Sequence, residues 1–151
     1  MTDTLPVETK AQTDVETAAQ AEAMLNARFP GAVLGATTHR GTTTLTIRAQ
    51  DLVNVARFVR DEPTLRFNLL ENIVAVDWSK FPGHRAKERF TTNYQLFSSA
   101  NLRRLVLKVP APGGDSPAVP SITGLWKGAE WPEREAYDLM GVKFEGHPDL
   151  R

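Results

Sequence analysis

The chain has 151 residues, with 18 Lys and Arg against 18 Asp and Glu, and it contains no Cys. This length is typical of a single domain, and the lack of Cys excludes disulfides, thiolate metal sites and Cys-ligated iron–sulfur clusters. The zero net charge argues against a dedicated nucleic-acid binder, and no run approaches the roughly 18 apolar residues of a membrane span. Because the N-terminus lacks the basic start and apolar run of a secretory signal, we expect a soluble or peripheral protein of the cytoplasm.

The first residues of the chain, 1–12, are polar and show no periodicity, which predicts a disordered tail. Thr13 and Glu16 then have the spacing of a capping box, in which two side chains satisfy the free N–H groups at a helix start. Apolar residues recur every three to four positions as far as Phe29, and Pro30 ends the pattern. We expect an amphipathic helix over this stretch.

Two short strands and a second helix are expected next. Thr and aliphatic residues alternate in residues 32–38 and 42–49, and His39, Arg40 and Gly41 form the turn between them. Asp51 is placed to cap a helix that Pro63 ends.

Three further strands complete the predicted domain. Residues 69–78 contain an unbroken aliphatic run, Ile73–Val76, which is typical of a central strand buried on both faces. Strands around residues 90–96 and 105–109 are joined by a short connection at 98–101. Since consecutive strands with short links pair antiparallel, residues 13–109 predict an α+β core domain, with a single mostly antiparallel sheet and helices packed on one face.

A different composition follows this domain. Residues 110–117 are rich in Pro and Gly and predict a hinge. Residues 118–151 are dense in Trp, Gly, Pro and acidic residues, so we expect an extended tail with a short helix that lies against its own domain or a partner. Pro132 suits the first turn of that helix, and Gly141 can adopt the left-handed conformation that ends it. Arg134 and Asp138 are four residues apart and can therefore form an ion pair.

The charges are unevenly distributed, which leaves open an RNA-binding alternative. Residues 39–109 carry a net charge of +6, and the segments before and after carry −3 each. A module that uses the basic loop at 80–89 together with Phe81 and Phe90 would bind RNA with a steep salt dependence. A solvated sheet face with a charged loop explains the same pattern without any partner.

A free-standing enzyme would use Glu135, Asp138 and His147. However, Glu133 and Glu135 diverge by roughly 200° on a helix, and only Glu135 and Asp138 share a face. A capped helix with an internal ion pair is the favoured interpretation. We therefore predict no catalytic, cofactor-binding or metal site in this chain.

The last residues resemble a family signature. The resemblance covers residues 120–151 and is carried by Pro120-Ser121-Ile122, Trp126, Ala129-Glu130-Trp131-Pro132-Glu133-Arg134-Glu135, Asp138, Gly141, Phe144 and Gly146-His147-Pro148-Asp149-Leu150-Arg151. These residues are similar to the signature of the thirty-kilodalton subunit family of respiratory NADH:quinone oxidoreductase (complex I), the subunit designated C. The family usually continues past the position of Arg151, where this chain stops.

The resemblance implies an accessory structural subunit in the hydrophilic arm of complex I, which braces the quinone-reducing module. It implies no cofactor on this chain, with FMN, the iron–sulfur clusters, NADH and quinone bound by other subunits. The implied partners are chiefly the large subunit designated D and the cluster-bearing subunits B and I, on the cytoplasmic side of the inner membrane. The implied interface residues are Trp131, Glu133, Arg134, Glu135, Asp138, Gly141, Phe144, His147, Pro148 and Arg151. The equivalent subunit of a related energy-converting membrane hydrogenase is the alternative.

Overall fold

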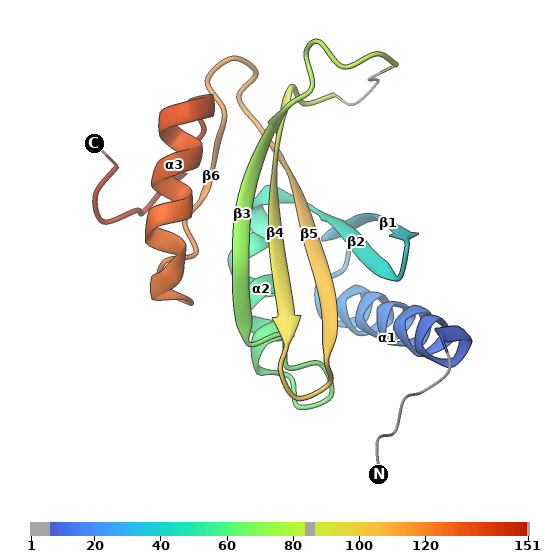
Figure 1. The fold of residues 1–151 in the computed structure, drawn as a ribbon. Helices are drawn as coiled ribbons and strands as arrows, with labels where there is room; N and C mark the ends of the chain where they lie inside the picture. The colour runs from blue at the N-terminus through green and yellow to red at the C-terminus, as the bar shows by residue number, and fades with distance from the viewer. Residues whose placement is uncertain (1–6, 84–86, 151) are drawn as a thin grey trace.

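The computed structural model describes residues 7–83 and 87–150 (Figure 1). Within them, five strands form one sheet in the order β1-β2-β5-β4-β3. The strands are β1 (Val33–His39), β2 (Thr42–Ile47), β3 (Leu69–Asp77), β4 (Phe90–Ser98) and β5 (Arg103–Ala111). The α+β class and the mostly antiparallel sheet are therefore confirmed.

The sheet consists of two antiparallel units joined by one parallel pair. Strands β1 and β2 form a hairpin whose turn places Arg40 and Gly41 at positive φ, and β3, β4 and β5 form a meander. Strand β2 pairs parallel with β5, with Leu45 opposite Leu107. The rule that short links give antiparallel pairs does not cover this junction, because the chain from β2 to the meander passes through a helix.

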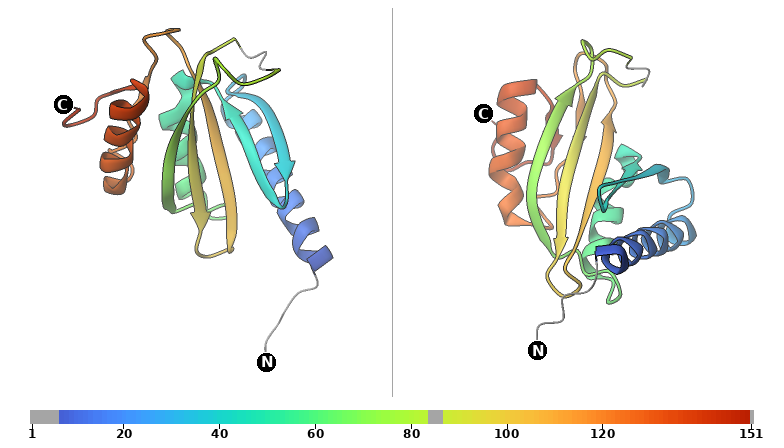
Figure 2. Two further views of the ribbon diagram at one scale, coloured as in Figure 1. Left: turned by 45° about the horizontal axis from the view of Figure 1, so that its top comes forward. Right: turned by 45° about the vertical axis from the view of Figure 1, so that its right-hand side comes forward.

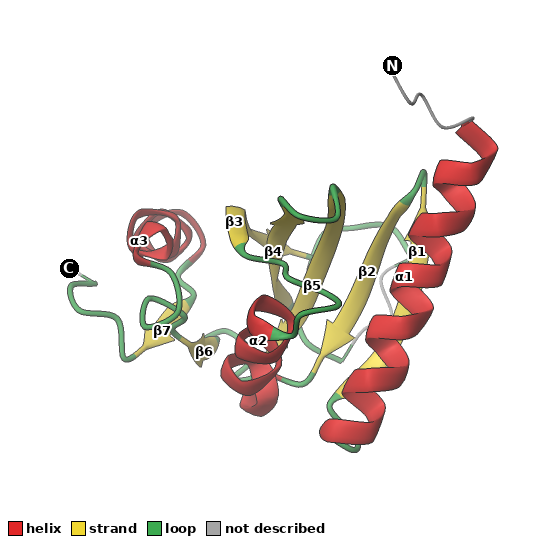
Figure 3. Ribbon diagram, turned by 90° about the horizontal axis from the view of Figure 1, so that it is seen from below, coloured by secondary structure: helices red, strands yellow, loops and turns green. Residues whose placement is uncertain are grey.

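Two helices cover one face of the sheet, α1 (Val7–Arg28) and α2 (Leu52–Asp61) (Figure 3). The core lies between them and a row of buried side chains that crosses four strands, made of Leu45, Leu107, Tyr94 and Ile73. The other face carries polar and charged neighbours such as Arg104 on β5, where buried and more exposed residues alternate as they do on a strand with one covered face.

Both predicted helix starts differ in detail from the structure. Helix α1 begins at Val7 and not at Thr13, so the segment predicted to be disordered is helical from residue 7, and residues 1–6 lie outside the described residues. Neither Gly nor Pro interrupts the sequence between Pro6 and Pro30, so nothing stops the helix from extending upstream. Asp51 is the last residue of a 3₁₀ turn (Ala49–Asp51) that leads directly into α2. Its carboxylate accepts a 2.6 Å bond from Arg48 Nε and caps no helical N–H.

The central position that the aliphatic run predicts for β3 is wrong, because β3 is one of the two edge strands of the five-stranded sheet. Ile73 faces the helices, whereas Val74 on the other face is 37% exposed. A third helix, α3 (Glu130–Met140), packs beside β3 (Figures 1 and 2). The apolar run in β3 therefore reflects packing against the core on one face of the sheet and against α3 at the edge of the sheet.

The C-terminal segment forms a small β-α-β unit. Strands β6 (Ala118–Pro120) and β7 (Lys143–Glu145) pair parallel, and a 3₁₀ turn (Lys127–Ala129) and α3 connect them. Strand β5 runs to Ala111, so the first two residues of the predicted hinge at 110–117 are in a strand. Residues 118–145 therefore form a β-α-β unit and not the extended tail that the sequence predicts. Parallel strands need a crossover connection, and α3 supplies it. In the described part of the chain, no helix has the length and apolar character to cross a bilayer.

Candidate functional site

Helix α3 carries the centre of the family-like signature, and local sequence fixes both of its ends. Pro132 lies in the first turn, where its missing N–H is no loss. Gly141 adopts a left-handed conformation (φ 74°) and donates its N–H to the Tyr137 carbonyl at 2.9 Å, as predicted for a helix end. The helix therefore presents its side chains on defined faces.

Glu133 is fully buried and forms the centre of a polar network inside the C-terminal segment. Ser121 Oγ, just after β6, donates to Glu133 Oε1 at 2.6 Å and lies 2.9 Å from Oε2. The Ile122 N–H donates to the same Oε1 at 3.2 Å, and Thr123 Oγ1 lies 2.9 Å from Ser121 Oγ. This carboxyl group therefore fixes the chain between β6 and α3.

Burial raises the pKa of Glu133 to about 7, although the bonds from Ser121 and Ile122 and the proximity of His147 oppose the rise. No cation is bonded to the carboxyl group in the described structure. A protonated Glu133 can donate to Ser121 Oγ, which in turn can donate to Thr123, so the neutral form keeps every partner.

The last residues fold back on α3 through a second polar cluster. Arg134 Nε donates to the Asp149 carbonyl at 3.1 Å, and its Nη2 lies 3.4 Å from Asp149 Oδ2 and 3.9 Å from Glu130 Oε1. His147 Nε2 is 2.8 Å from the Glu130 carbonyl, and its Nδ1 accepts the Asp149 N–H at 2.9 Å. The pairing of Arg134 with Asp138 predicted from spacing is replaced by these contacts, because the chain after β7 returns to Arg134.

Four residues of α3 point away from the rest of the segment. Trp131 and Leu139 are 69% and 71% exposed, and Glu135 and Asp138 lie between them and are also exposed. At about 100° per residue these positions fall within an arc of roughly 100°. We call Trp131, Glu135, Asp138 and Leu139 the outer face of α3.

The remaining predicted interface residues take other places. Phe144 on β7 is buried and Pro148 is exposed, whereas Arg151 lies outside the described residues. The predicted set thus divides into residues that hold the segment together, such as Glu133, Arg134 and His147, and residues that face outwards.

The three residues considered for catalysis do not form one site. His147 binds the Glu130 carbonyl at the start of α3, and Asp138 lies eight residues further on, about 12 Å along the helix axis. Glu135 and Asp138 belong to the outer face, not to the side that His147 contacts. In residues 7–83 and 87–150, His, Asp and Glu side chains nowhere gather in a group of three suited to a metal ion.

The residues considered for RNA binding are also separated. Phe90 is buried in the core and Phe81 is exposed, with its ring 5.0 Å from that of Trp78. Arg89 donates to Asp77 and Asp115 at 2.8 Å each, which holds the pKa of Asp77 well below its usual range. The basic loop is thus partly neutralised, and its residues 84–86 lie outside the described residues.

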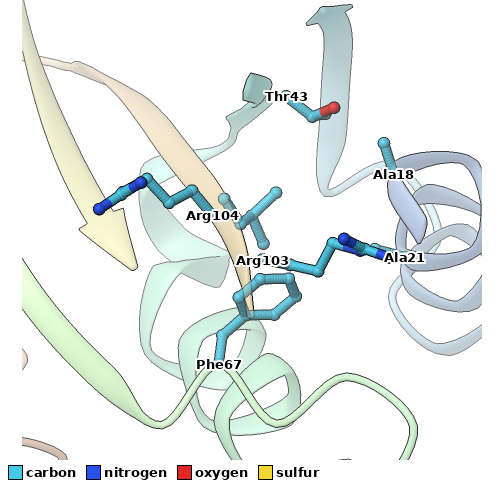
Figure 4. A pocket seen from close by; sticks show the side chains of 7 residues that line it. Ala18, Ala21, Thr43, Phe67, Arg103 and Arg104 are labelled. Atoms are coloured by element: carbon cyan, nitrogen blue, oxygen red, sulfur yellow. The ribbon is translucent and has the colours of Figure 1, made fainter. Parts of the chain in front are cut away.

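A small, partly open hollow lies between α1, β2 and β5 and is lined by Ala18, Ala21, Thr43, Phe67 and Arg103 among others (Figure 4). Its volume of about 10 Å³ has space for about one water molecule. The Arg103 side chain extends along it towards Ala21 (Figure 4). This hollow is too small to hold a substrate.

The sheet and its β-α-β extension form a fold that two solved structures share. The trypsin-resistant fragment of Nqo5 aligns over 93% of this chain and 99% of that fragment, with a TM-score of 0.65 and 27% identity. A chain of the membrane-bound sulfane sulfur reductase, an archaeal respiratory membrane complex, shares the fold at 20% identity, with a TM-score of 0.69 over 88% of this chain and 73% of that one.

Residues 45–151 match the family described as the 30 kDa subunit of respiratory-chain NADH dehydrogenase, and the chain belongs to this family. The NADH-quinone oxidoreductase subunit designated C in Roseiflexus sp. (strain RS-1) is 45% identical over 128 residues, which cover 83% of this chain and 69% of that protein. The same subunit of Burkholderia multivorans is 44% identical over 134 residues, which cover 88% of this chain and 65% of that one. The chain thus spans about two thirds of the length of these relatives.

Two features of the signature region do not follow from the sequence pattern. The pattern does not predict the buried network of Glu133, although Ser121 is part of the same motif and is a natural partner for a carboxylate. It also does not indicate Leu139, the most exposed large apolar residue of α3, which lies eight positions after Trp131 and therefore near the same face.

Proposed function

We propose that this chain is a non-catalytic subunit of the hydrophilic arm of complex I, where it braces the quinone-reducing module. The observation that carries the proposal is the 45% identity over 83% of the chain to the Roseiflexus protein, which is named as a subunit of NADH-quinone oxidoreductase. The geometry supports it, because Glu133, Arg134 and His147 are engaged in contacts that order the C-terminal segment. These contacts give the segment a defined surface that a partner subunit can bind.

The partners we propose are, chiefly, the large subunit designated D and the adjacent cluster-bearing subunits B and I. In this proposal the chain binds no cofactor, and the FMN, iron–sulfur clusters, NADH and quinone belong to the other subunits. The chain would then lie on the cytoplasmic side of the inner membrane, attached through its partners. The exposed Trp131 supports a protein contact on the C-terminal segment, since Trp is enriched in protein interfaces.

Mild purification from membranes through a tag on this chain tests the proposal. We expect an assembly that oxidises NADH, reduces quinone and shows flavin and iron–sulfur absorbance, whereas the chain expressed alone shows neither absorbance nor turnover. A tagged chain that is recovered from its own cells without other subunits would contradict a bracing role.

The second candidate is the equivalent subunit of a related energy-converting membrane hydrogenase. The fold occurs in a second kind of respiratory membrane complex, the archaeal one, so the fold alone does not separate the two candidates. The co-purified chains do separate them. Flavin-binding NADH subunits support complex I, and nickel-site subunits support the hydrogenase.

A further inference from the structure

We propose that the outer face of α3, together with the groove between α3 and β3, is a docking surface for a basic amphipathic segment of another subunit. This inference rests on the proposed function, because it specifies the chemistry of one partner of the same C-terminal segment. Three observations carry it: exposed apolar anchors, a groove beside them, and a negative charge between them that forms no ion pair within residues 7–83 and 87–150.

The first observation is the exposure of two large apolar side chains on one face. Trp131 and Leu139 are 69% and 71% exposed and lie about two helical turns apart. The buried side of α3 is formed by Glu133 and Ala136. The side chains of Trp131 and Leu139 therefore do not belong to the core. Large exposed residues grouped on one face are typical of a site of association.

The second observation is a groove that continues this face towards the sheet. It is lined on one side by residues of α3 and on the other by the edge strand β3, namely by Glu135, Ala136, Leu139 and Met140 and by Asn72, Ile73, Val74 and Ala75. Its volume is about 240 Å³, and a cavity of roughly 150 Å³ is enough for benzene. Both Met140 and Val74 are partly exposed there. The groove can therefore receive an aromatic or branched side chain of a partner.

The third observation is the charge of the helix. In sequence, α3 carries four acidic residues and a single base, Arg134. That base lies 6.0 Å from the Trp131 ring but directs its bonds to Asp149 and towards Glu130. Glu135 and Asp138 are left on the outer face, between the apolar anchors. A segment with Arg or Lys between apolar residues is complementary to this pattern, and an acidic or neutral segment is not.

The docking surface is also separable from the network that folds the segment. Its polar residues, Glu135 and Asp138, are exposed, whereas the network uses Glu133, Arg134 and His147. Substitutions at exposed positions away from such contacts rarely change stability. Loss of partner binding can therefore be measured without loss of the fold.

The experiment replaces the subunit in its own cells with tagged variants and measures, by quantitative mass spectrometry, how much of it remains in the purified complex. We expect the double variant Trp131→Ala/Leu139→Ala to be retained about tenfold less than the wild type, as for hot-spot residues. Glu135→Lys/Asp138→Lys is expected to lower retention more than Glu135→Gln/Asp138→Asn does. Leu34→Ala, at an equally apolar exposed site on β1, is the matched control and is expected to be retained normally.

A photo-cross-linking residue at position 131 identifies the partner segment in the intact complex. We expect one segment of another subunit, with Arg or Lys between apolar residues, and we expect reversal of its charge to restore the retention lost in Glu135→Lys/Asp138→Lys. Normal retention of both double variants, or a cross-link to lipid, to this chain itself or to an acidic segment, would overturn the docking surface and leave the proposed function intact. A wild-type chain that never joins the complex would instead overturn the proposed function.

Discussion

The sheet domain and the C-terminal β-α-β unit are stabilised in different ways. The sheet is held by a continuous apolar core in which Leu45, Tyr94 and Leu107 are almost completely buried. The C-terminal unit buries fewer apolar side chains, chiefly Ile122, Val142 and Phe144. It adds the polar network around Glu133 and the contacts of Arg134 with Asp149. Apolar packing tolerates a range of similar sequences, whereas a buried polar network requires particular partners.

This difference explains why the recognisable signature lies in the smaller region. Ser121, Glu133 and His147 each contact a specific atom of another residue, so the sequence there is constrained by geometry. The two regions are connected by polar bonds as well. Trp126 Nε1 donates to the Asn68 carbonyl at 2.8 Å, and Arg60 on α2 donates to the Leu125 carbonyl at 2.9 Å.

The largest expected effect lies in the sheet core. Leu107→Ala removes a fully buried side chain from the row that crosses four strands, and the free energy of unfolding should fall by about 3 kcal/mol. Urea denaturation followed by circular dichroism measures this change, with Leu34→Ala as the exposed control. If both variants unfold at the same urea concentration, the row across β2, β5, β4 and β3 is not the main core.

The next effect is a pH dependence that belongs to the C-terminal unit. Folding raises the pKa of Glu133 from an ordinary value of 4.5 to about 7, so between these values the folded state keeps a proton that the unfolded state has released. The free energy of unfolding should therefore fall by roughly 2.5 kcal/mol as pH rises from about 4.5 to 7, because the slope approaches about 1.4 kcal/mol per pH unit only between the two pKa values.

Glu133→Gln is the matched control for this pH dependence, since the amide keeps the shape and cannot ionise. The difference between wild type and variant should be small at pH 4.5, grow in favour of the variant as pH rises to about 7, and stay constant above that pH. Parallel pH profiles for the two proteins would show that folding leaves the pKa of Glu133 unchanged, and that its network is an ordinary surface contact.

A smaller effect is expected from Arg134→Ala. The substitution removes the bonds to Asp149, and a hydrogen bond that involves a charged group contributes about 1.5 kcal/mol when half-buried. Amide hydrogen exchange should become faster for residues 145–150 and remain unchanged in β4 and β5. Equal acceleration in both regions would mean that the C-terminal unit and the sheet unfold together.

The smallest effect is expected for the exposed pair of Arg104 and Glu71, whose atoms are 3.1 Å apart on the open side of the sheet. Arg104→Ala should change the free energy of unfolding by less than about 0.5 kcal/mol, because solvent and salt screen such pairs. A larger decrease of the free energy of unfolding in the same urea titration would indicate that the open face of the sheet contributes to stability as much as the helix-covered face.

Local features of the fold could be predicted from sequence, and non-local ones could not. The turn at Arg40 and Gly41, the connection after Ser98 and the left-handed Gly141 follow from residues next to one another. The parallel pairing of β2 with β5 and the edge position of β3 depend on strands that are distant in sequence. An apolar run indicates that a strand is buried, but it does not indicate whether neighbouring strands or a helix bury it.

The same distinction applies to the candidate site. The helix boundaries of α3 and the shared face of Glu135 and Asp138 follow from helical periodicity. The burial of Glu133 depends on the return of β6 towards α3, and the contacts of Arg134 depend on the return of the chain after β7. Spacing within a helix therefore suggests Asp138 as the partner of Arg134, whereas the folded chain supplies Asp149.

The parallel junction between β2 and β5 has a consequence for how the protein folds. The β1–β2 hairpin and the β3–β5 meander are each made of neighbouring strands, so each can form early from local encounters. The junction has to close a long loop that contains α2 and two strands, and loop closure of this kind is the slow step in mixed topologies. Until it closes, two sheet edges are unpaired, and a nascent chain is then most exposed to mispairing with another copy.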